Sequence, residues 1–264
     1  MARRKSIFIT GGGSGIGRAV AQRFAQGGWF VGLGDVDDAG MAGTVGMIGA
    51  DNGFTQRFDV RERAAWDKAL AAFDTAAGGI DALVNNAGIP LGGPLIENSE
   101  DEIARCLDVN LKGVLFGAQA AFPYLLKTAP GSCLLNTASA AGIYGSPSSS
   151  VYSATKFGVR GLTESLDGEW AKHGIKVASL CPSFIDTPLL SHTMNARANA
   201  DIRSRVVDAG LEITPVSEVA EAAWNAVHGD KVHWLVGKTA KRMGFGARWM
   251  PGRVRKDMRK RGSL

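Results

Sequence analysis

The 264-residue sequence predicts a single α/β domain built on a doubly wound parallel β-sheet of about seven strands flanked by helices. Three observations favour this fold class. Short apolar segments alternate along the chain with longer segments of helical periodicity, as successive βα units require. The first apolar segment runs into a glycine-rich turn that opens a helical pattern. No linker divides the chain, so we expect one domain over residues 1–237, followed by a basic C-terminal extension over residues 238–264.

The predicted strands are short, apolar and bounded by turn residues, and they cover residues 5–10, 29–34, 53–58, 81–84, 132–137, 175–180 and 232–236. Between them the apolar residues recur with helical spacing. The predicted helices begin near residues 16 and 217, extend over 61–77 and 108–126, and include one that carries Tyr152 and Lys156. Residues 189–212 contain no clean strand pattern, and we expect a substrate loop there, either a lid over the site or a helical surface excursion.

The glycine-rich turn is the sequence Thr10-Gly11-Gly12-Gly13-Ser14-Gly15-Ile16-Gly17. Glycines allow the backbone to turn tightly and to approach a pyrophosphate, and the N-terminus of the following helix supplies free amides. Asp35 closes the second predicted strand about 20 residues later, where a carboxylate binds the ribose hydroxyls of NAD. Neither Ser14 nor Val36 could receive the additional phosphate of NADP, so the pattern favours NAD. The alternative to this binding role is that Asp35 is simply a turn residue.

Tyr152 and Lys156 are four residues apart, so on a helix they lie on one face. An ammonium close to a phenol favours the phenolate and lowers its pKa, whereas desolvation opposes that shift. We expect the cation to bring the pKa of the phenol closer to neutral pH, where proton transfer is efficient. Taken alone, the pair is equally typical of a solvated surface helix.

Other polar residues follow the predicted strands at their carboxyl ends, which is where ligands bind in open α/β sheets. The fourth strand runs into Asn85-Asn86-Ala87-Gly88, and Ser139 stands just past the fifth. Asn110 lies near the start of the helix predicted over residues 108–126. Together with the glycine turn and the Tyr152-x-x-x-Lys156 pair, this order and spacing resemble the short-chain dehydrogenase/reductases, specifically their compact single-domain branch. The resemblance covers roughly residues 5–237 and implies a Rossmann fold.

The resemblance also implies a catalytic set. Tyr152 would act as general acid/base, and Lys156 would lower its pKa and bind the nicotinamide ribose. Ser139 would hydrogen-bond the substrate oxygen, and Asn110 would hold a water in a proton relay. The implied cofactor contacts for NAD are Gly11, Ser14, Gly15, Ile16, Gly17, Asp35, Asp59, Val60, Asn86, Ala87, Gly88, Tyr152, Lys156, Pro182, Ile185 and Thr187.

The substrate is expected to contact Ser139, Ile143, Tyr152 and Phe184, with Leu91, Tyr144 and the 189–212 segment nearby. Because these residues are largely apolar, we expect a hydrophobic secondary alcohol or ketone. One position departs from the family pattern: Ser183 follows Pro182 where a glycine is usual. Either the backbone is ordinary there or the serine hydroxyl replaces a contact. We expect no metal, because the four histidines lack metal-ligand spacing.

The C-terminal extension holds ten of the 30 Lys and Arg residues and one of the 25 acidic residues, so the rest of the chain is slightly acidic. It admits three interpretations: a basic amphipathic helix on an anionic membrane surface, a flap over a neighbouring subunit's active site, or a solvated tail. No nucleic-acid partner is expected, because no recognition motif accompanies the charge.

No stretch approaches the ~20 apolar residues that span a membrane, and the apolar run at the N-terminus is too short for a signal peptide. The three widely spaced cysteines form no disulfide pattern. We therefore expect a cytoplasmic protein with reduced thiols, and the resemblance implies a homo-oligomer, a dimer or tetramer. Two alternatives to a soluble dehydrogenase stay open: a non-catalytic NAD-binding regulatory protein, and a membrane-surface dehydrogenase of lipid-like alcohols such as retinoids or steroids.

Overall fold

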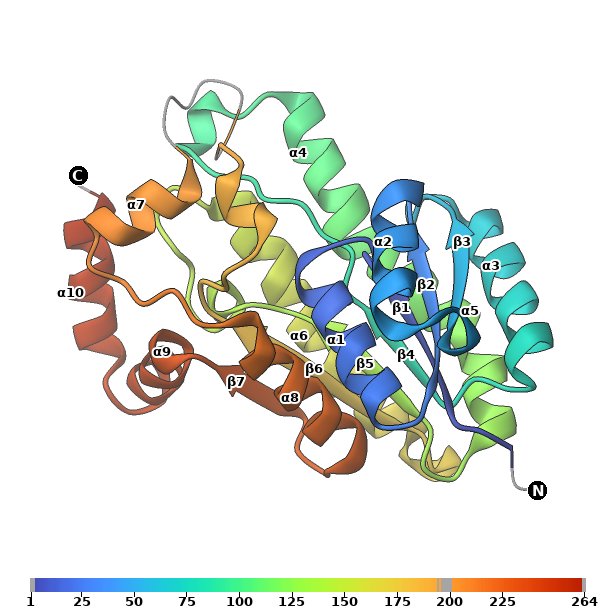
Figure 1. Cartoon of the computed structure of the whole chain (residues 1–264). Helices are drawn as coiled ribbons and strands as arrows, with labels where there is room; N and C mark the ends of the chain where they lie inside the picture. Colours follow the sequence, from blue (N-terminus) through green and yellow to red (C-terminus); the bar gives the residue numbers. More distant parts are fainter. Residues whose placement is uncertain (1–2, 194, 196–200, 263–264) are drawn as a thin grey trace.

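The computed structural model describes residues 3–193, 195 and 201–262. Its sheet has seven parallel strands in the order β3-β2-β1-β4-β5-β6-β7 (Figure 1). The strands are β1 (Ser6–Thr10), β2 (Phe30–Asp35), β3 (Gly53–Arg57), β4 (Ala82–Asn85), β5 (Cys133–Thr137), β6 (Lys176–Pro182) and β7 (His233–Val236). The chain winds outward from β1 to β3 and then returns past β1 to build the other half. The predicted doubly wound parallel sheet is therefore confirmed.

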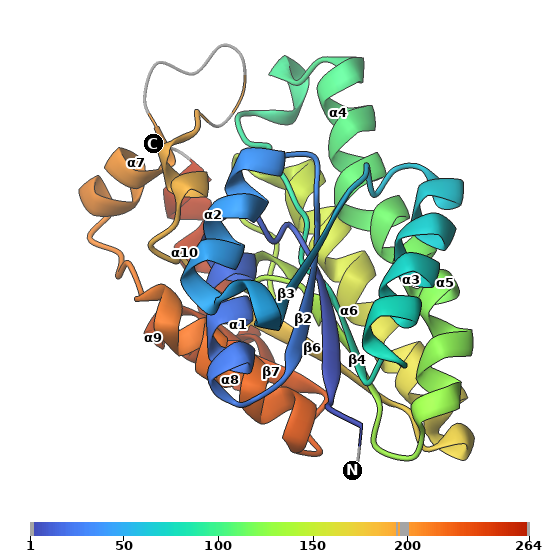
Figure 2. The same cartoon turned by 45° about the vertical axis from the view of Figure 1, so that its right-hand side comes forward.

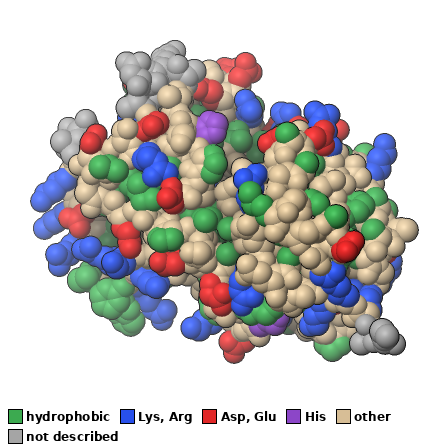
Figure 3. Space-filling model, in the orientation of Figure 1, with side chains coloured by type: hydrophobic (Ala, Val, Ile, Leu, Met, Phe, Trp, Pro, Cys, Tyr) green, Lys and Arg blue, Asp and Glu red, His purple; other side chains and the backbone are tan. Residues whose placement is uncertain are grey.

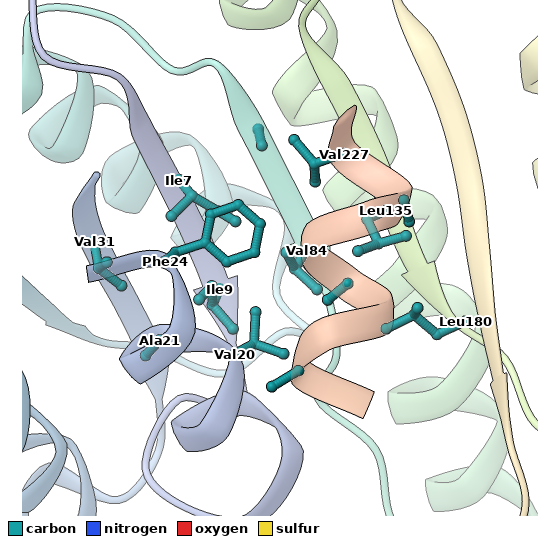
Figure 4. Packing of buried hydrophobic residues seen from close by; sticks show 14 of the residues in the cluster. Ile7, Ile9, Val20, Ala21, Phe24, Val31, Val84, Leu135, Leu180 and Val227 are labelled. Carbon is teal, nitrogen blue, oxygen red and sulfur yellow. The ribbon is translucent and has the colours of Figure 1, made fainter. Parts of the chain in front are cut away.

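The central strands are buried on both faces, which explains their continuous apolar character. Ile7 and Ile9 of β1 point to one face of the sheet, and Phe8 between them points to the other. All three side chains are fully buried. Figure 4 shows Ile7 and Ile9 packed beside Val84 and Leu135 of the neighbouring strands.

One face is covered by α1 (Gly15–Gln26), α2 (Asp38–Ile48) and α8 (Val216–His228). Phe24 of α1 fills the space between the sheet and α8, with its ring centroid 5.2 Å from that of Trp29 and 5.1 Å from that of Trp224 (Figure 4). This packing fixes α1, and with it the glycine turn that precedes α1, against the end of β1.

The opposite face is covered by α3 (Arg63–Ala77), α5 (Gly113–Thr128) and α6 (Ser150–Trp170), as Figure 2 shows. Trp66 and Phe73 of α3 are fully buried against Phe8 and Leu83 of the sheet. The long helix α6 carries Tyr152 and Lys156 in its first two turns, and Leu166 and Trp170 farther along it anchor the helix in this core.

Two helix predictions differ from the structure. The helix α2, which carries three internal glycines, was not predicted. The helix predicted over residues 108–126 has wrong bounds: α4 (Glu100–Leu107) comes first, then a π-helical turn (Asp108–Lys112), then α5. The earlier start has a local cause. Ser99 accepts a hydrogen bond from the backbone of Glu102, whose carboxylate accepts one in return from the Ser99 amide, a capping box that begins the helix at residue 100.

The C-terminal extension consists of two helices, α9 (Lys238–Trp249) and α10 (Pro251–Gly262), and α9 packs against β7 and the residues after β5. A frayed, solvated tail is therefore wrong for the described part of this segment. Within the predicted 189–212 loop, a short 3₁₀ turn (Pro188–Ser191) and α7 (Ile202–Asp208) are seen, whereas residues 194 and 196–200 lie outside the described residues. Among the helices described, none is long and apolar enough to cross a membrane.

Candidate active site

A cavity of about 880 Å³ opens at the carboxyl ends of the strands. The glycine turn, Asp35 and the end of β3 line one half, and the ends of β5 and β6, α6 and α9 line the other. Of the predicted site residues, those that line it are Gly11, Ser14, Gly15, Ile16, Asp35, Asp59, Val60, Asn86, Ala87, Gly88, Ser139, Tyr152, Lys156, Pro182, Phe184, Ile185 and Thr187. Gly17, Asn110 and Ile143 are not among the lining residues.

The glycine turn is held in an unusual backbone conformation that its sequence makes possible. Gly11 has φ +67° and Gly15 has φ +51°, values that glycine adopts without strain. Gly17 lies beneath the turn, and a Cβ at Gly17 would be 2.1 Å from the carbonyl oxygen of Gly11. It therefore allows α1 to pack closely under the turn, which is a structural role and not a contact with the cavity.

The turn is also tied to the segment after β4. The hydroxyl of Thr10 accepts hydrogen bonds from the backbone amides of Asn86 (3.0 Å) and Ala87 (3.1 Å), and the Asn86 side-chain amide donates to the Thr10 carbonyl (2.9 Å). Of these bonds, the one from the Asn86 side chain requires an amide side chain at that position. They fix the two walls of the cavity relative to each other.

Asp35 presents its carboxylate at the cavity wall next to the glycine turn. One oxygen accepts a hydrogen bond from the amide of Gly13 (2.9 Å), and the other accepts from the amides of Val36 (2.7 Å) and Asp37 (3.1 Å). Farther along the wall Asp59 forms an ion pair with Arg61 (2.6 Å), and the side-chain hydrogen bond from Arg61 holds the pKa of Asp59 below its ordinary value.

Ser139, Tyr152 and Lys156 meet at the other end. Ser139 caps a short turn, its hydroxyl accepting a hydrogen bond from the Ala141 amide at 3.1 Å and donating one to the Pro182 carbonyl at 3.5 Å. The Lys156 ammonium donates to the Thr137 carbonyl (2.8 Å) and lies 5.5 Å from the centroid of the Tyr152 ring. Tyr152 and Lys156 therefore lie on one face of α6, as predicted. The hydrogen bond of the ammonium, however, goes to the backbone of β5.

The expected lowering of the Tyr152 pKa is not seen. Burial raises the pKa of Tyr152 to about 12, against a smaller lowering by the hydrogen bond with Ser139. Burial also lowers the pKa of Lys156 to about 8. Lys156 is buried and Tyr152 is half-buried in the cavity wall, and desolvation disfavours the charged form of each. At neutral pH this site holds a protonated phenol, ready to donate a proton.

Asn110 is fully buried in the π-helical turn behind the cavity wall. Its side-chain amide donates to the Ile89 carbonyl (2.9 Å) and to the Cys106 sulfur (3.4 Å), and its oxygen accepts from the Ile89 amide (2.9 Å). A methyl group placed on Gly88 would lie 3.3 Å from the Asn110 oxygen and 3.7 Å from the Lys156 nitrogen. Gly88 thus stands between these two polar groups.

The substrate end contains both expected and unexpected residues. Phe184 and Leu91 line the cavity. Ile143 is half-buried and packs against a cluster that contains Val114, Val159 and Cys181, and its contact with substrate stays a prediction. Tyr144 is not among the lining residues either. Ser183 has no left-handed φ, so the backbone is ordinary where the family has glycine, although its buried hydroxyl has no hydrogen-bond partner within the part of the chain that the structure describes.

Several lining residues were not predicted. These are Thr239 and Met243 of α9, Arg105 of α4 and Val109 of the π-helical turn, whereas Ile202 of α7 lies in the predicted 189–212 segment. No motif marks these positions. The one available signal was the four-residue spacing of Thr239 and Met243 in a segment rich in cations, which indicates an inward helical face.

The comparisons with known proteins agree with this geometry. The family model described as "short chain dehydrogenase" matches residues 5–198. The chain is 33% identical over 228 residues to 2,5-dichloro-2,5-cyclohexadiene-1,4-diol dehydrogenase from Sphingobium indicum, covering 82% of this chain and 84% of that protein. With its parallel sheet and the site at the carboxyl ends of the strands, the chain belongs to the short-chain dehydrogenase/reductase family, a family of oxidoreductases.

Solved structures show the same fold over nearly the whole chain. A short-chain dehydrogenase/reductase from Burkholderia phymatum, in complex with NAD, has a TM-score of 0.82 and 28% identity, covering 97% of this chain and 95% of that one. The 3-ketoacyl-(acyl-carrier-protein) reductase from Brucella melitensis, complexed with NADH, has a TM-score of 0.79 and 31% identity, covering 90% and 99%.

Proposed function

We propose that this protein catalyses reversible hydride transfer between NAD(H) and a hydrophobic secondary alcohol or ketone. The observation that carries the proposal is the arrangement of one cavity, which has the glycine turn and Asp35 at one end and Ser139, Tyr152 and Lys156 at the other. When bound, NAD accepts the hydride in oxidation, and NADH supplies it in reduction. The chain supplies binding, orientation and the proton.

The residues present fit a dinucleotide. The first amides of α1 have no partners within the helix and suit a pyrophosphate, which the glycines allow to approach. A hydrogen bond from the Gly13 amide holds the Asp35 carboxylate in position at the end of β2, where it can bind the hydroxyls of a ribose. A 2′-phosphate would meet that negative charge, so we propose NAD in preference to NADP. The two relatives with NAD or NADH support this choice.

In the proposed mechanism Tyr152 is the general acid/base. During reduction its phenol donates a proton to the substrate oxygen while hydride adds to the carbonyl carbon, and during oxidation the phenolate takes the proton back. Ser139 donates a hydrogen bond to the same oxygen and polarises it. Lys156 binds the nicotinamide ribose and passes protons toward Asn110 through a water beside Gly88. A Cβ added at Gly88 would lie 3.3 Å from the Asn110 oxygen and 3.7 Å from the Lys156 nitrogen, so the lack of a side chain there leaves both groups open to a shared water, which supports that path.

The substrate end supports a hydrophobic molecule. Leu91, Phe184, Leu190 and Met243 contribute apolar side chains to the cavity wall, while Ser139 and Tyr152 provide its polar groups. Such a wall recognises shape more than polarity. The similarity to a dehydrogenase of a chlorinated cyclohexadienediol supports a secondary alcohol on a ring as a first test compound.

A regulatory protein that binds NAD without turnover is the second candidate. The presence of Ser139, Tyr152 and Lys156 together in one cavity wall favours the enzyme instead. We also propose, from the family resemblance, that the protein works as a cytoplasmic homo-oligomer, a dimer or tetramer.

The proposal is tested by following absorbance at 340 nm with a panel of cyclic and aromatic secondary alcohols, with NAD and NADP in parallel reactions. We expect NADH formation with at least one member of the panel and a lower kcat/KM with NADP. Dinucleotide binding without turnover of any alcohol or ketone would favour the regulatory protein.

A further inference from the structure

The helix α9 has two faces with different chemistry. Thr239 and Met243 face the active-site cavity, and Ala240 and Gly246 are buried against the domain. The outer face carries Phe245, which is 59% exposed, and Trp249, which is 65% exposed. Because Phe245 and Trp249 are four residues apart they share one face of the helix, and adjacent exposed aromatics indicate a surface that binds something apolar.

Cations surround the exposed aromatics. On α9 the exposed cations are Lys238, Lys241, Arg242 and Arg248, and on α10 they include Arg253, Arg255, Lys256 and Arg259. In these two helices Asp257 is the one acidic residue. Lys238 pairs with Glu212, but within the described ranges no carboxylate forms an ion pair with the other cations named here. Figure 3 shows Lys and Arg side chains gathered over α10 and α9, with a hydrophobic patch beside them.

The two helices are packed together as one platform. A Cβ on Gly246 would lie 2.8 Å from a methyl carbon of Val254, so glycine at this position permits close contact between α9 and α10. Val254 and Met258, four residues apart, are the half-buried side chains of α10, and its remaining described side chains are exposed. This packing holds α10, and the exposed cations it carries, against α9.

We propose that the outer faces of α9 and α10 dock the protein on an anionic lipid bilayer. Aromatic side chains enter the interface between headgroups and acyl chains, while Lys and Arg attract anionic headgroups. The charge disfavours binding of this face to the same face of a second copy, because that contact would bring two strongly cationic surfaces together. The exposed aromatics beside an apolar cavity favour a bilayer over a nucleic acid.

This docking has a consequence for substrate access. Because α9 carries the docking residues on one face and Thr239 and Met243 on the other, the bilayer surface would lie one helix diameter, about 10 Å, from the cavity. A hydrophobic alcohol dissolved in the membrane would then reach the site over a short path. This second step rests on the proposed function, whereas the docking itself does not.

The test is flotation of the full-length protein with vesicles of phosphatidylcholine alone or with about a third phosphatidylglycerol. At ~0.05 M salt the wild type should float with the anionic vesicles and remain in solution with the zwitterionic ones. Salt at ~1 M shortens the screening length to about 3 Å and should release it. No flotation of the wild type at low salt would overturn the proposal.

Two double variants separate the contributions. R253E/K256E reverses two cations of α10, and since each cation near an anionic surface contributes roughly fivefold to affinity, binding should weaken by at least about 25-fold. F245S/W249S removes the aromatics and should also weaken binding, with the cations intact. Thermal unfolding of each variant checks that the fold is kept.

Matched controls lie elsewhere on the surface. K68E/K172E makes the same charge change at exposed lysines of α3 and of the turn after α6, and I96S removes a side chain that is 95% exposed. Both should float like the wild type. Equal weakening by K68E/K172E and R253E/K256E would overturn the proposal in favour of general charge. Preferential binding of duplex DNA, or oligomer dissociation by F245S/W249S without vesicle binding, would also overturn it. Absence of turnover in the alcohol screen would overturn the proposed function but would not change the interpretation of the flotation results.

Discussion

A side chain at position 88 would come between Asn110 and Lys156, the two groups that the proposed proton relay connects. A methyl group there would contact both the Asn110 oxygen and the Lys156 nitrogen, at 3.3 and 3.7 Å. Its backbone φ lies outside the left-handed region, so alanine fits the local conformation. We therefore propose that glycine at this position matters for the proton relay and not for the folding of the chain.

We therefore expect Gly88→Ala to lower kcat about tenfold or more while changing the free energy of unfolding by less than about 1 kcal/mol, because the methyl group blocks the relay without straining the backbone. The measurement is steady-state kinetics alongside chemical denaturation. Gly161→Ala on α6, where a Cβ meets no atom within 4 Å, is the matched control. Unchanged kcat in Gly88→Ala would remove the relay from the mechanism.

Lys156 links proton binding to stability. Its pKa is lowered by burial to about 8, whereas in the unfolded chain a lysine keeps its proton until about pH 10.4. Between these values the unfolded state binds more protons than the folded state. The contribution of Lys156 to the free energy of unfolding must then rise with pH in this window.

Comparison with Lys156→Met isolates this contribution. The free energy of unfolding of the wild type minus that of the variant should increase between pH 8 and 9.5, by at most ~1.4 kcal/mol per pH unit, because one proton is involved. Denaturant titrations at several pH values measure it, with the exposed Lys68→Met as control. A difference that stays flat over this window would mean that burial does not lower the Lys156 pKa.

At the scale of single elements, the strands and the site-bearing turns were predictable because their local signals agree with the fold. Each strand is an apolar run, and the glycine turn and Tyr152-x-x-x-Lys156 have fixed spacing. The failures have local causes too. The helix α2 contains three glycines, which weaken helical periodicity, and the π-helical turn around Asn110 adds a residue per turn that no 3.6-residue pattern reveals.

The helix α3 supports the adenosine end of the cavity through one side chain. Trp66 is fully buried, its ring centroid lies 5.0 Å from that of Phe58, and its indole nitrogen donates to the Val60 carbonyl at 2.9 Å. Packing of the sheet and placement of Val60 thus depend on the same residue.

Trp66→Ala should lower the free energy of unfolding by about 3–5 kcal/mol, because it leaves a large cavity in the core. It should also weaken NAD binding, since Val60 loses its support. Denaturation and calorimetric titration measure the two effects. Trp249→Ala makes the same change at an exposed position and should cost less than about 0.5 kcal/mol. A loss at Trp66 as small as at Trp249 would contradict the packing described here.

At the scale of the whole molecule, the site is made by segments that are far apart in the sequence. The family motifs predicted the walls formed by the strand ends. They did not predict Met243, which comes from α9 and reaches the cavity only because α9 folds back against β7. Ile143 shows the opposite case: its place in the sequence suggested the cavity, but it is not among the lining residues and packs against the cluster around Val114. Positions set by tertiary packing leave little trace in local pattern.

The position of Met243 predicts substrate selectivity. Met243→Trp should raise KM for bulky alcohols by about tenfold or more, because the larger side chain narrows the cavity, and should leave the affinity for NAD unchanged. Met47→Trp, at an exposed position on α2, should change neither. Kinetics with a small and a bulky alcohol measure the effect. An equal change for both alcohols would place Met243 outside the substrate end.

The central claim is that the Tyr152 hydroxyl carries the proton in hydride transfer. The most direct measurement compares kcat and NADH affinity of the wild type, Tyr152→Phe and the control Tyr124→Phe, whose hydroxyl lies on α5 away from the cavity. We predict that Tyr152→Phe binds NADH with wild-type affinity but loses at least about 10³-fold in kcat, whereas Tyr124→Phe keeps both. A Tyr152→Phe protein with kcat within about tenfold of the wild type would contradict the mechanism.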